Sequence, residues 1–198
     1  MGAADADKVD VVSECVRQLS DMKTYLKLTE EELKNIITDI QNKLKRTVES
    51  HLYKGNCMKK EATFLLSKMY VFDILHFYSV WKILKNPIVG RPIVAGYNWM
   101  LTPASIFVGH YLKEFYSKFE NILTDSLSLI KILENTVFDK DYFLFTIDFK
   151  NLYTNISVKD AIKIIKELFF RYQNIIPNAH FILELLELVL NCAIMKFQ

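Results

Sequence analysis

The spacing of apolar residues predicts that most of this chain is helical. A short helix is expected over residues 9–19, and a longer one begins after Thr29, where Thr29 and Glu32 have the spacing of a capping box. The apolar stripe of the long helix continues to Val48. Further helices are expected over residues 61–76, 102–115, 125–134, 157–169 and 181–192.

Two stretches depart from this helical pattern and predict strands. Residues 77–97 contain two apolar runs around a turn marked by Asn86-Pro87 and Gly90, which is typical of a β-hairpin. Residues 142–148 form a nearly unbroken aromatic and β-branched run, which indicates a strand covered on both faces. The helix after Ser157 is expected to pack on that strand. Together these patterns predict an α+β fold that is rich in helix and has a small sheet.

The apolar run from Phe64 to Leu84 is long enough to be compared with a membrane span. Lys68, Asp73, His76 and Lys82 interrupt it, and charged side chains are costly at the centre of a bilayer. We therefore interpret the run as a buried helix followed by a strand, and we expect no membrane-spanning segment.

Composition narrows the possible classes of protein. Hydrophobic residues make up 51% of the 198 residues and aromatic residues 13%, which indicates a chain that forms a core. The formal net charge is only +2, so any contact with nucleic acid must come from a local group of cations.

We expect an N-terminal helical region over residues 1–60, a second region over 61–135 and a third over 136–198.

Cysteine and histidine spacing predicts no disulfide framework and no metal site. The three cysteines, Cys15, Cys57 and Cys192, are scattered and odd in number, which favours a reducing, intracellular compartment, either nucleus or cytoplasm. Each histidine is interpreted as a partly buried or surface residue rather than a ligand. The four are His51, His76, His110 and His180.

Basic residues gather in two places. Lys43, Lys45 and Arg46 lie toward the end of the long helix, where they form either a solvated face or a phosphate-contacting patch. The residues alone favour the solvated face. The hairpin carries a second group.

Lys82, Lys85 and Arg91 lie on or near the predicted hairpin. Cations that project from a rigid hairpin can hold a triphosphate or a nucleic-acid backbone. The alternative is an edge hairpin that its charges keep soluble.

Asp148 follows the predicted strand directly. A carboxylate at the mouth of a buried strand is well placed to hold Mg²⁺ with further ligands from elsewhere, and such a site suits metal-assisted phosphoryl transfer. An aspartate that only caps a turn is the alternative, and it is the better interpretation of an isolated aspartate.

The segment from Asp148 to Ile156 reads Asp-Phe-Lys-Asn-Leu-Tyr-Thr-Asn-Ile and resembles the A motif of reverse transcriptases, with the closest match in Penelope-like retroelements. In that family the aspartate binds the catalytic metal, and the aromatic residue five positions later packs under the sugar of the incoming nucleotide. The resemblance gives these roles to Asp148 and Tyr153, and it places Phe149 with Tyr153 among the nucleotide-binding residues.

A second segment, residues 77–94, resembles the fingers of the same family. The matching residues are Phe77-Tyr78, Lys82-Ile83, Lys85-Asn86-Pro87 and Gly90-Arg91-Pro92-Ile93-Val94. The resemblance implies that Lys82 and Arg91 hold nucleotide phosphates. It also favours contact with nucleic acid by Lys85 and makes such contact by the basic group on the long helix more plausible than the residues alone indicate. Trp81, Leu84 and Ala95 depart from the family pattern, which commonly has Pro, His and Ser there.

The resemblance implies the fingers and the first part of the palm of a polymerase right hand. The chain ends at Gln198, before the Gln-Gly-x-x-x-Gly segment and the paired aspartates that family members carry next. Magnesium is therefore expected only in a completed site. The expected partners are RNA or an RNA–DNA hybrid, and the remaining palm and thumb or other protein subunits.

Three interpretations of function follow. The chain is a truncated reverse transcriptase domain that is inactive alone, or a recruited non-catalytic remnant that serves as a structural or nucleic-acid-binding subunit. The third interpretation is a helical domain with a small sheet that is unrelated to polymerases. It is the weakest of the three, because the chain carries two motifs of the family in the family's order.

Overall fold

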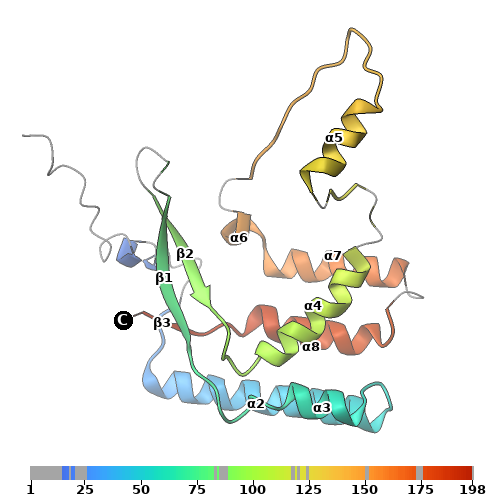
Figure 1. Cartoon of the computed structure of the whole chain (residues 1–198). Coiled ribbons are helices and arrows are strands. Elements are labelled where there is room, and N and C mark those ends of the chain that lie inside the picture. Colours follow the sequence, from blue (N-terminus) through green and yellow to red (C-terminus); the bar gives the residue numbers. More distant parts are fainter. Residues whose placement is uncertain are drawn as a thin grey trace, which may run out of the picture.

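The computed structural model describes most of the chain after residue 14 (Figure 1). The described residues are 15–17, 19–20, 26–82, 84, 89–116, 119, 121–123, 125–149, 152–172 and 176–197, without the side chains of Val89, Tyr153 and Thr154. Of the helix expected over residues 9–19, residues 15–17 and 19 are helical and the rest lies outside the described residues.

The long helix α2 (Glu30–Tyr53) begins as its capping box predicts. The Thr29 hydroxyl accepts a hydrogen bond from the Glu32 backbone N–H at 3.2 Å, and the Glu32 carboxylate accepts one from the Thr29 backbone N–H at 2.8 Å. The predicted stripe is buried at Ile40, Leu44 and Val48. This helix was therefore predictable in its start and in its inward face.

Most of the remaining helices also lie where the spacing predicts them. They are α3 (Lys59–Leu65), α4 (Thr102–Tyr116), α5 (Ser126–Glu134), α6 (Leu152–Asn155), α7 (Val158–Arg171) and α8 (Ala179–Asn191). Ser157 caps α7 by accepting the Asp160 backbone N–H at 3.3 Å, and Asp125 caps α5 by accepting the Ser128 N–H at 2.7 Å. The four-residue α6 was not predicted.

The described residues within 77–97 form the two paired strands of the predicted hairpin, and residues 83 and 85–88 lie outside the described part of the chain. Strands β1 (Leu75–Lys82) and β2 (Val89–Ala95) pair antiparallel, and the apolar side of β1 is buried at Leu75 and Phe77. A third, unpredicted strand, β3 (Met195–Lys196), pairs in parallel with the start of β1, with Leu75 beside Met195. The sheet order is β2-β1-β3, so the described fold is α+β and helix-rich with a small mixed sheet.

The helix predicted over residues 61–76 is wrong in its extent, because α3 ends at Leu65. Long-range hydrogen bonds hold the segment after it. The Asp73 backbone N–H donates to the Asn98 carbonyl at 2.9 Å, and the Gln41 side chain donates to the Met69 carbonyl at 2.8 Å. These contacts draw the chain away from a helical path and start β1 two residues earlier than the predicted hairpin.

The strand predicted over residues 142–148 is also wrong. These residues belong to no described strand, and their large side chains are exposed, Phe143 by 80% and Phe145 by 71%. The run has strand-forming composition, but a strand needs a hydrogen-bonding neighbour, and no described strand pairs with it. Helix α7 accordingly does not cover this run and packs against α8 instead.

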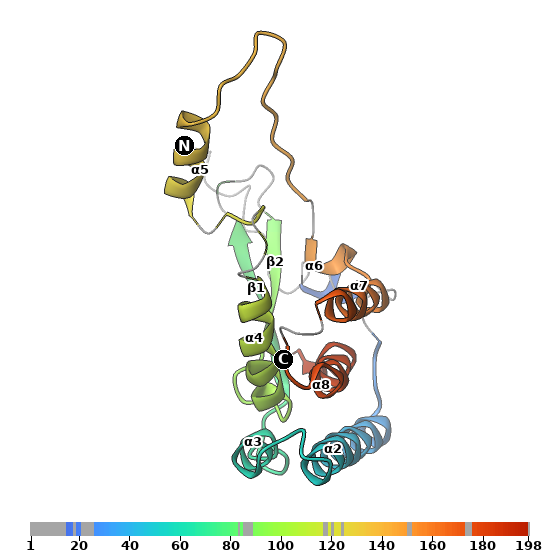
Figure 2. The same ribbon diagram turned by 90° about the vertical axis from the view of Figure 1, so that its right-hand side faces the viewer.

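One hydrophobic core joins segments that are far apart in the chain. Helix α8 packs against α2, α4 and α7, and α3 contacts α2 and α4 (Figure 2). Buried residues from all three predicted regions meet in one cluster, among them Leu44, Met100 and Leu185. Helix α5 has no buried residue, and it projects with the segment after it away from α2, α3 and α8 in both views.

No helix among the described residues combines the length and the hydropathy that crossing a membrane requires.

Candidate functional site

The register of the hairpin brings Lys82 and Arg91 onto one face. Arg91 pairs with Val80, and Lys82 pairs with Val89. Directly opposite residues of an antiparallel pair project to the same side, as do residues two apart on one strand, so Lys82 and Arg91 are diagonal neighbours on this side. Both residues are exposed.

This outward face of the hairpin is partly apolar around the two cations. Tyr78 and Val80 lie on the same side and are each 47% exposed, whereas Leu75 and Phe77 on the other side are buried. The sequence predicted Lys82, Lys85 and Arg91 on or near a hairpin, and Lys82 and Arg91 do lie on its two strands. Lys85 lies outside the described residues.

The basic group on α2 does not share this face. Figures 1 and 2 show the far end of β1 lying well away from α2. Lys43 pairs with Asp39 at 2.7 Å and Lys45 with Glu49 at 3.9 Å, both one helical turn away. The hydrogen bond that Lys43 donates to the Asp39 carboxylate raises the pKa of Lys43. Arg46 is exposed and makes no ion pair with another described residue. These contacts fit the solvated-face interpretation.

Asp148 does not stand at the mouth of a buried strand. It is exposed and lies in a segment without regular secondary structure. Within the described part of the chain it belongs to no group of three side chains that could hold a metal ion. An exposed single carboxylate leaves Mg²⁺ mostly hydrated, because this ion gives up its water reluctantly.

The two predicted nucleotide-binding aromatics flank the end of the same segment. Phe149 is 72% exposed. Tyr153 lies in α6, and its side chain is outside the described residues. No described contact joins Asp148 or Phe149 to Lys82 or Arg91, so the metal part and the phosphate part of the predicted site are not brought together.

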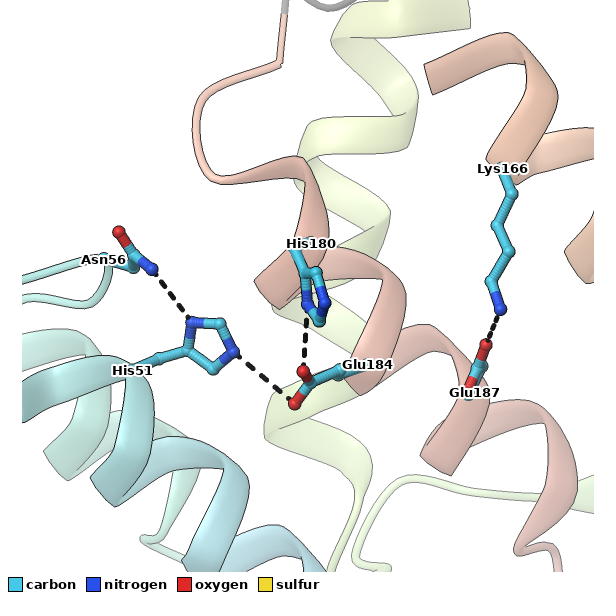
Figure 3. A network of polar contacts seen from close by, with 6 residues as sticks. All are labelled: His51, Asn56, Lys166, His180, Glu184 and Glu187. Carbon is cyan, nitrogen blue, oxygen red and sulfur yellow. Dashed lines mark hydrogen bonds and ion pairs between the residues drawn. The ribbon is translucent and has the colours of Figure 1, made fainter. Parts of the chain in front are cut away.

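The fold assembles one group of ligand-type side chains that sequence spacing did not reveal (Figure 3). His51, in the last turn of α2, lies with its Nε2 3.4 Å from the Glu184 carboxylate. His180 Nδ1 lies 2.9 Å from the other oxygen of the same carboxylate. The sequence indicated no cluster of histidines, whereas the fold brings His51 and His180 together at one carboxylate.

Only part of this group had a signal in the sequence. His180 and Glu184 are four residues apart on α8, which places them on one face of the helix. His51 is distant in the chain and joins them only because α2 packs against α8. A His-x-x-x-Glu pair is common on helix surfaces, and α4 carries another at His110 and Glu114.

Comparisons with protein-family models, with curated proteins and with solved structures found nothing that matches this chain.

Proposed function

We propose that this chain is a reverse transcriptase fragment of the Penelope-like type, made of fingers and the first part of a palm. In this proposal the outward face of the β1–β2 hairpin contacts phosphates of a nucleotide or of an RNA–DNA hybrid. The observation that carries the proposal is the placement of Lys82 and Arg91 as neighbours on one exposed face.

Physical chemistry supports the role of this face. A guanidinium group binds phosphate oxygens through a planar pair of N–H donors, and an ammonium group adds a compact positive charge. Two cations on a paired β-ribbon are held at a fixed spacing, so fewer conformations are lost when they bind. The aromatic ring of Tyr78, a diagonal neighbour of Arg91 on the same face, offers a surface on which a base or sugar can rest.

Polymerase activity of this chain alone is not part of the proposal. Two-metal phosphoryl transfer needs carboxylates around a pair of ions that lie roughly 4 Å apart. Asp148 supplies one carboxylate, and Asp139 and Asp141 lie at the start of the same exposed segment while Asp160 lies in the first turn of α7. None of these three can replace aspartates that arrive from a separate hairpin.

A second candidate function is a recruited, non-catalytic subunit of a larger assembly. The exposed apolar run over residues 142–149 favours it, because an apolar patch of this kind is typical of a surface that another chain covers. Both candidates share the fold and the hairpin face. They differ in whether Asp148 still works in catalysis.

The gene sequence beyond Gln198 and a primer-extension assay separate the two candidates. For a reverse transcriptase, the reading frame continues into the Gln-Gly-x-x-x-Gly segment and the paired aspartates. The extended chain then copies an RNA template with Mg²⁺, and Asp148→Asn abolishes extension. For a recruited subunit, a stop codon follows and the chain purifies in a stable complex. Extension by the 198-residue chain that Asp148→Asn abolishes would contradict both accounts.

A further inference from the structure

Two histidines and a glutamate from two packed helices point toward one another near the end of α2. His51 occupies the last turn of α2, and His180 and Glu184 occupy the first two turns of α8. The ligand atoms of all three residues lie within 4.8 Å of one another. Figure 3 shows both imidazole rings directed at the Glu184 carboxylate.

The distances between these atoms are close to those of a metal site. Two ligand atoms that are each about 2.1 Å from a tetrahedral ion lie about 3.4 Å apart. His51 Nε2 is 3.4 Å from one Glu184 oxygen, and His180 Nδ1 is 2.9 Å from the other. His180 is 80% exposed at its side chain, so its ring can move outward by a few tenths of an ångström without disturbing the core.

A second observation points to a ligand at this place. The side chain of His51 is only 3% exposed, and its Nε2 makes no hydrogen bond to any described residue even though it lies near the carboxylate. A buried ring nitrogen without a hydrogen bond costs free energy in the folded state. An ion bound between Nε2 and the carboxylate would remove that cost.

The surroundings of His51 hold its ring for such a role. The Asn56 side-chain amide lies 3.3 Å from Nδ1, and Phe181 packs against the ring with 4.6 Å between ring centroids. In the structure the Asn56 NH₂ group faces Nδ1. Turning this amide over would present its carbonyl oxygen instead, which would accept the Nδ1 proton and leave the Nε2 lone pair free for a metal. The Asn178 side chain donates a hydrogen bond to the backbone carbonyl of Asn56 at 2.8 Å, and this bond joins the loop that carries Asn56 to the start of α8.

We propose that His51 Nε2, His180 Nδ1 and Glu184 bind one divalent transition-metal ion, with Zn²⁺ as the best fit. Imidazole nitrogens with one carboxylate suit Zn²⁺, whereas Mg²⁺ prefers oxygen ligands. Glu184 is 37% exposed and His180 more so, which leaves a fourth position open to water. The ion links α2 to α8, and this site is separate from Asp148.

The test uses the whole 198-residue chain, stripped of metal with a chelator and titrated with Zn²⁺ by calorimetry. The wild-type chain is expected to bind one equivalent, and the midpoint of thermal unfolding should rise with Zn²⁺. His180→Ala removes an exposed ligand and should fold normally while weakening Zn²⁺ binding more than about 100-fold, since loss of a merely supporting residue costs about 10–100-fold. Asn56→Leu removes only a supporting residue and should weaken Zn²⁺ binding by about 10–100-fold.

His110→Ala is the matched control. His110 and Glu114 have the same spacing on α4, with 3.8 Å between His110 Nε2 and the Glu114 carboxylate, but they belong to no three-ligand group among the residues that the structure describes. This variant should bind Zn²⁺ as tightly as the wild type does, and excess Mg²⁺ should not compete. No saturable binding to the wild-type chain, or equal affinities of wild type and His180→Ala, would overturn the proposal.

Discussion

Asp73 and Asn98 hold each other through two hydrogen bonds at the base of the hairpin. The Asp73 backbone N–H donates to the Asn98 carbonyl at 2.9 Å, and the Asn98 side chain donates to the Asp73 carboxylate at 2.5 Å. The pair joins the chain entering β1 to the chain leaving β2. It is the contact that replaces the helix expected to continue past Leu65.

Asn98→Ala should therefore lower the free energy of unfolding by about 1 kcal/mol, the usual contribution of one hydrogen bond near a surface. Urea unfolding of the wild type, Asn98→Ala, Asp73→Ala and the double variant measures this loss and the coupling between the two side chains. Additive losses, with no coupling energy, would show that the pair does not hold the hairpin base.

The capping box of α2 makes stability depend on pH at Glu32. Hydrogen bonds from the Thr29 backbone and side chain, at 2.8 and 2.7 Å, hold the pKa of Glu32 below its usual value of 4.5. A lowered pKa in the folded state means that this stabilisation is present above the usual value. It is lost as the pH falls through the lowered pKa.

Glu32→Gln should accordingly destabilise the chain more than Glu31→Gln does at pH 7. Glu31 lies in the same first turn of α2, so it controls for the favourable effect of negative charge at a helix start. The difference between the two variants should shrink below pH 4.5 when unfolding is measured by circular dichroism. A difference that stays constant with pH would contradict the assignment to the carboxylate.

Burial makes Cys57 a poor nucleophile. Its side chain is buried beside the start of α3, and desolvation, helped by the charge of Glu61, raises the pKa of the Cys57 thiol from 9.0 to about 11. The thiolate fraction near pH 8 is then about 100-fold lower than for an ordinary cysteine. Iodoacetamide labelling followed by peptide mass spectrometry should show Cys57 reacting about 100-fold more slowly in the folded chain than in urea. Equal rates in the two conditions would contradict the burial.

The exposed segment over residues 142–149 should exchange its amide hydrogens quickly. Among its described backbone N–H groups only that of Tyr142 has a backbone acceptor, the Asp139 carbonyl at 3.1 Å. Amides without such bonds exchange nearly as fast as those of an unfolded peptide, whereas amides of β1 between its two neighbours should be protected. Hydrogen-exchange mass spectrometry compares the two segments directly. Strong protection over residues 142–149 would restore the strand that the sequence predicted.

The contrast between these two segments shows which features the sequence could predict. The start of α2, the Ser157 cap and the hairpin depend on residues close in the chain, so local patterns were sufficient. The run over residues 142–148 has the composition of a strand, but pairing depends on a distant neighbour that local pattern does not contain. Strand β3 was missed for the same reason, because its two residues are defined only by pairing with β1.

The candidate site divides in the same way. Lys82 and Arg91 share a face because hairpin register follows from local pairing, which the motif already implied. His51 and His180 come together only through the packing of α2 on α8, across most of the chain. The group of His51, His180 and Glu184 could therefore be found only from the fold.

The most direct test of the proposed function is the binding of an RNA–DNA hybrid by the hairpin face, measured by fluorescence anisotropy over a series of salt concentrations. Lys82→Ala and Arg91→Ala should each weaken binding and reduce the slope of log K against log salt by about 0.9, the loss of one phosphate contact. Lys113→Ala removes the same charge from the exposed side of α4 and should change neither quantity. Equal effects of all three variants, or no binding by the wild type at low salt, would contradict the account.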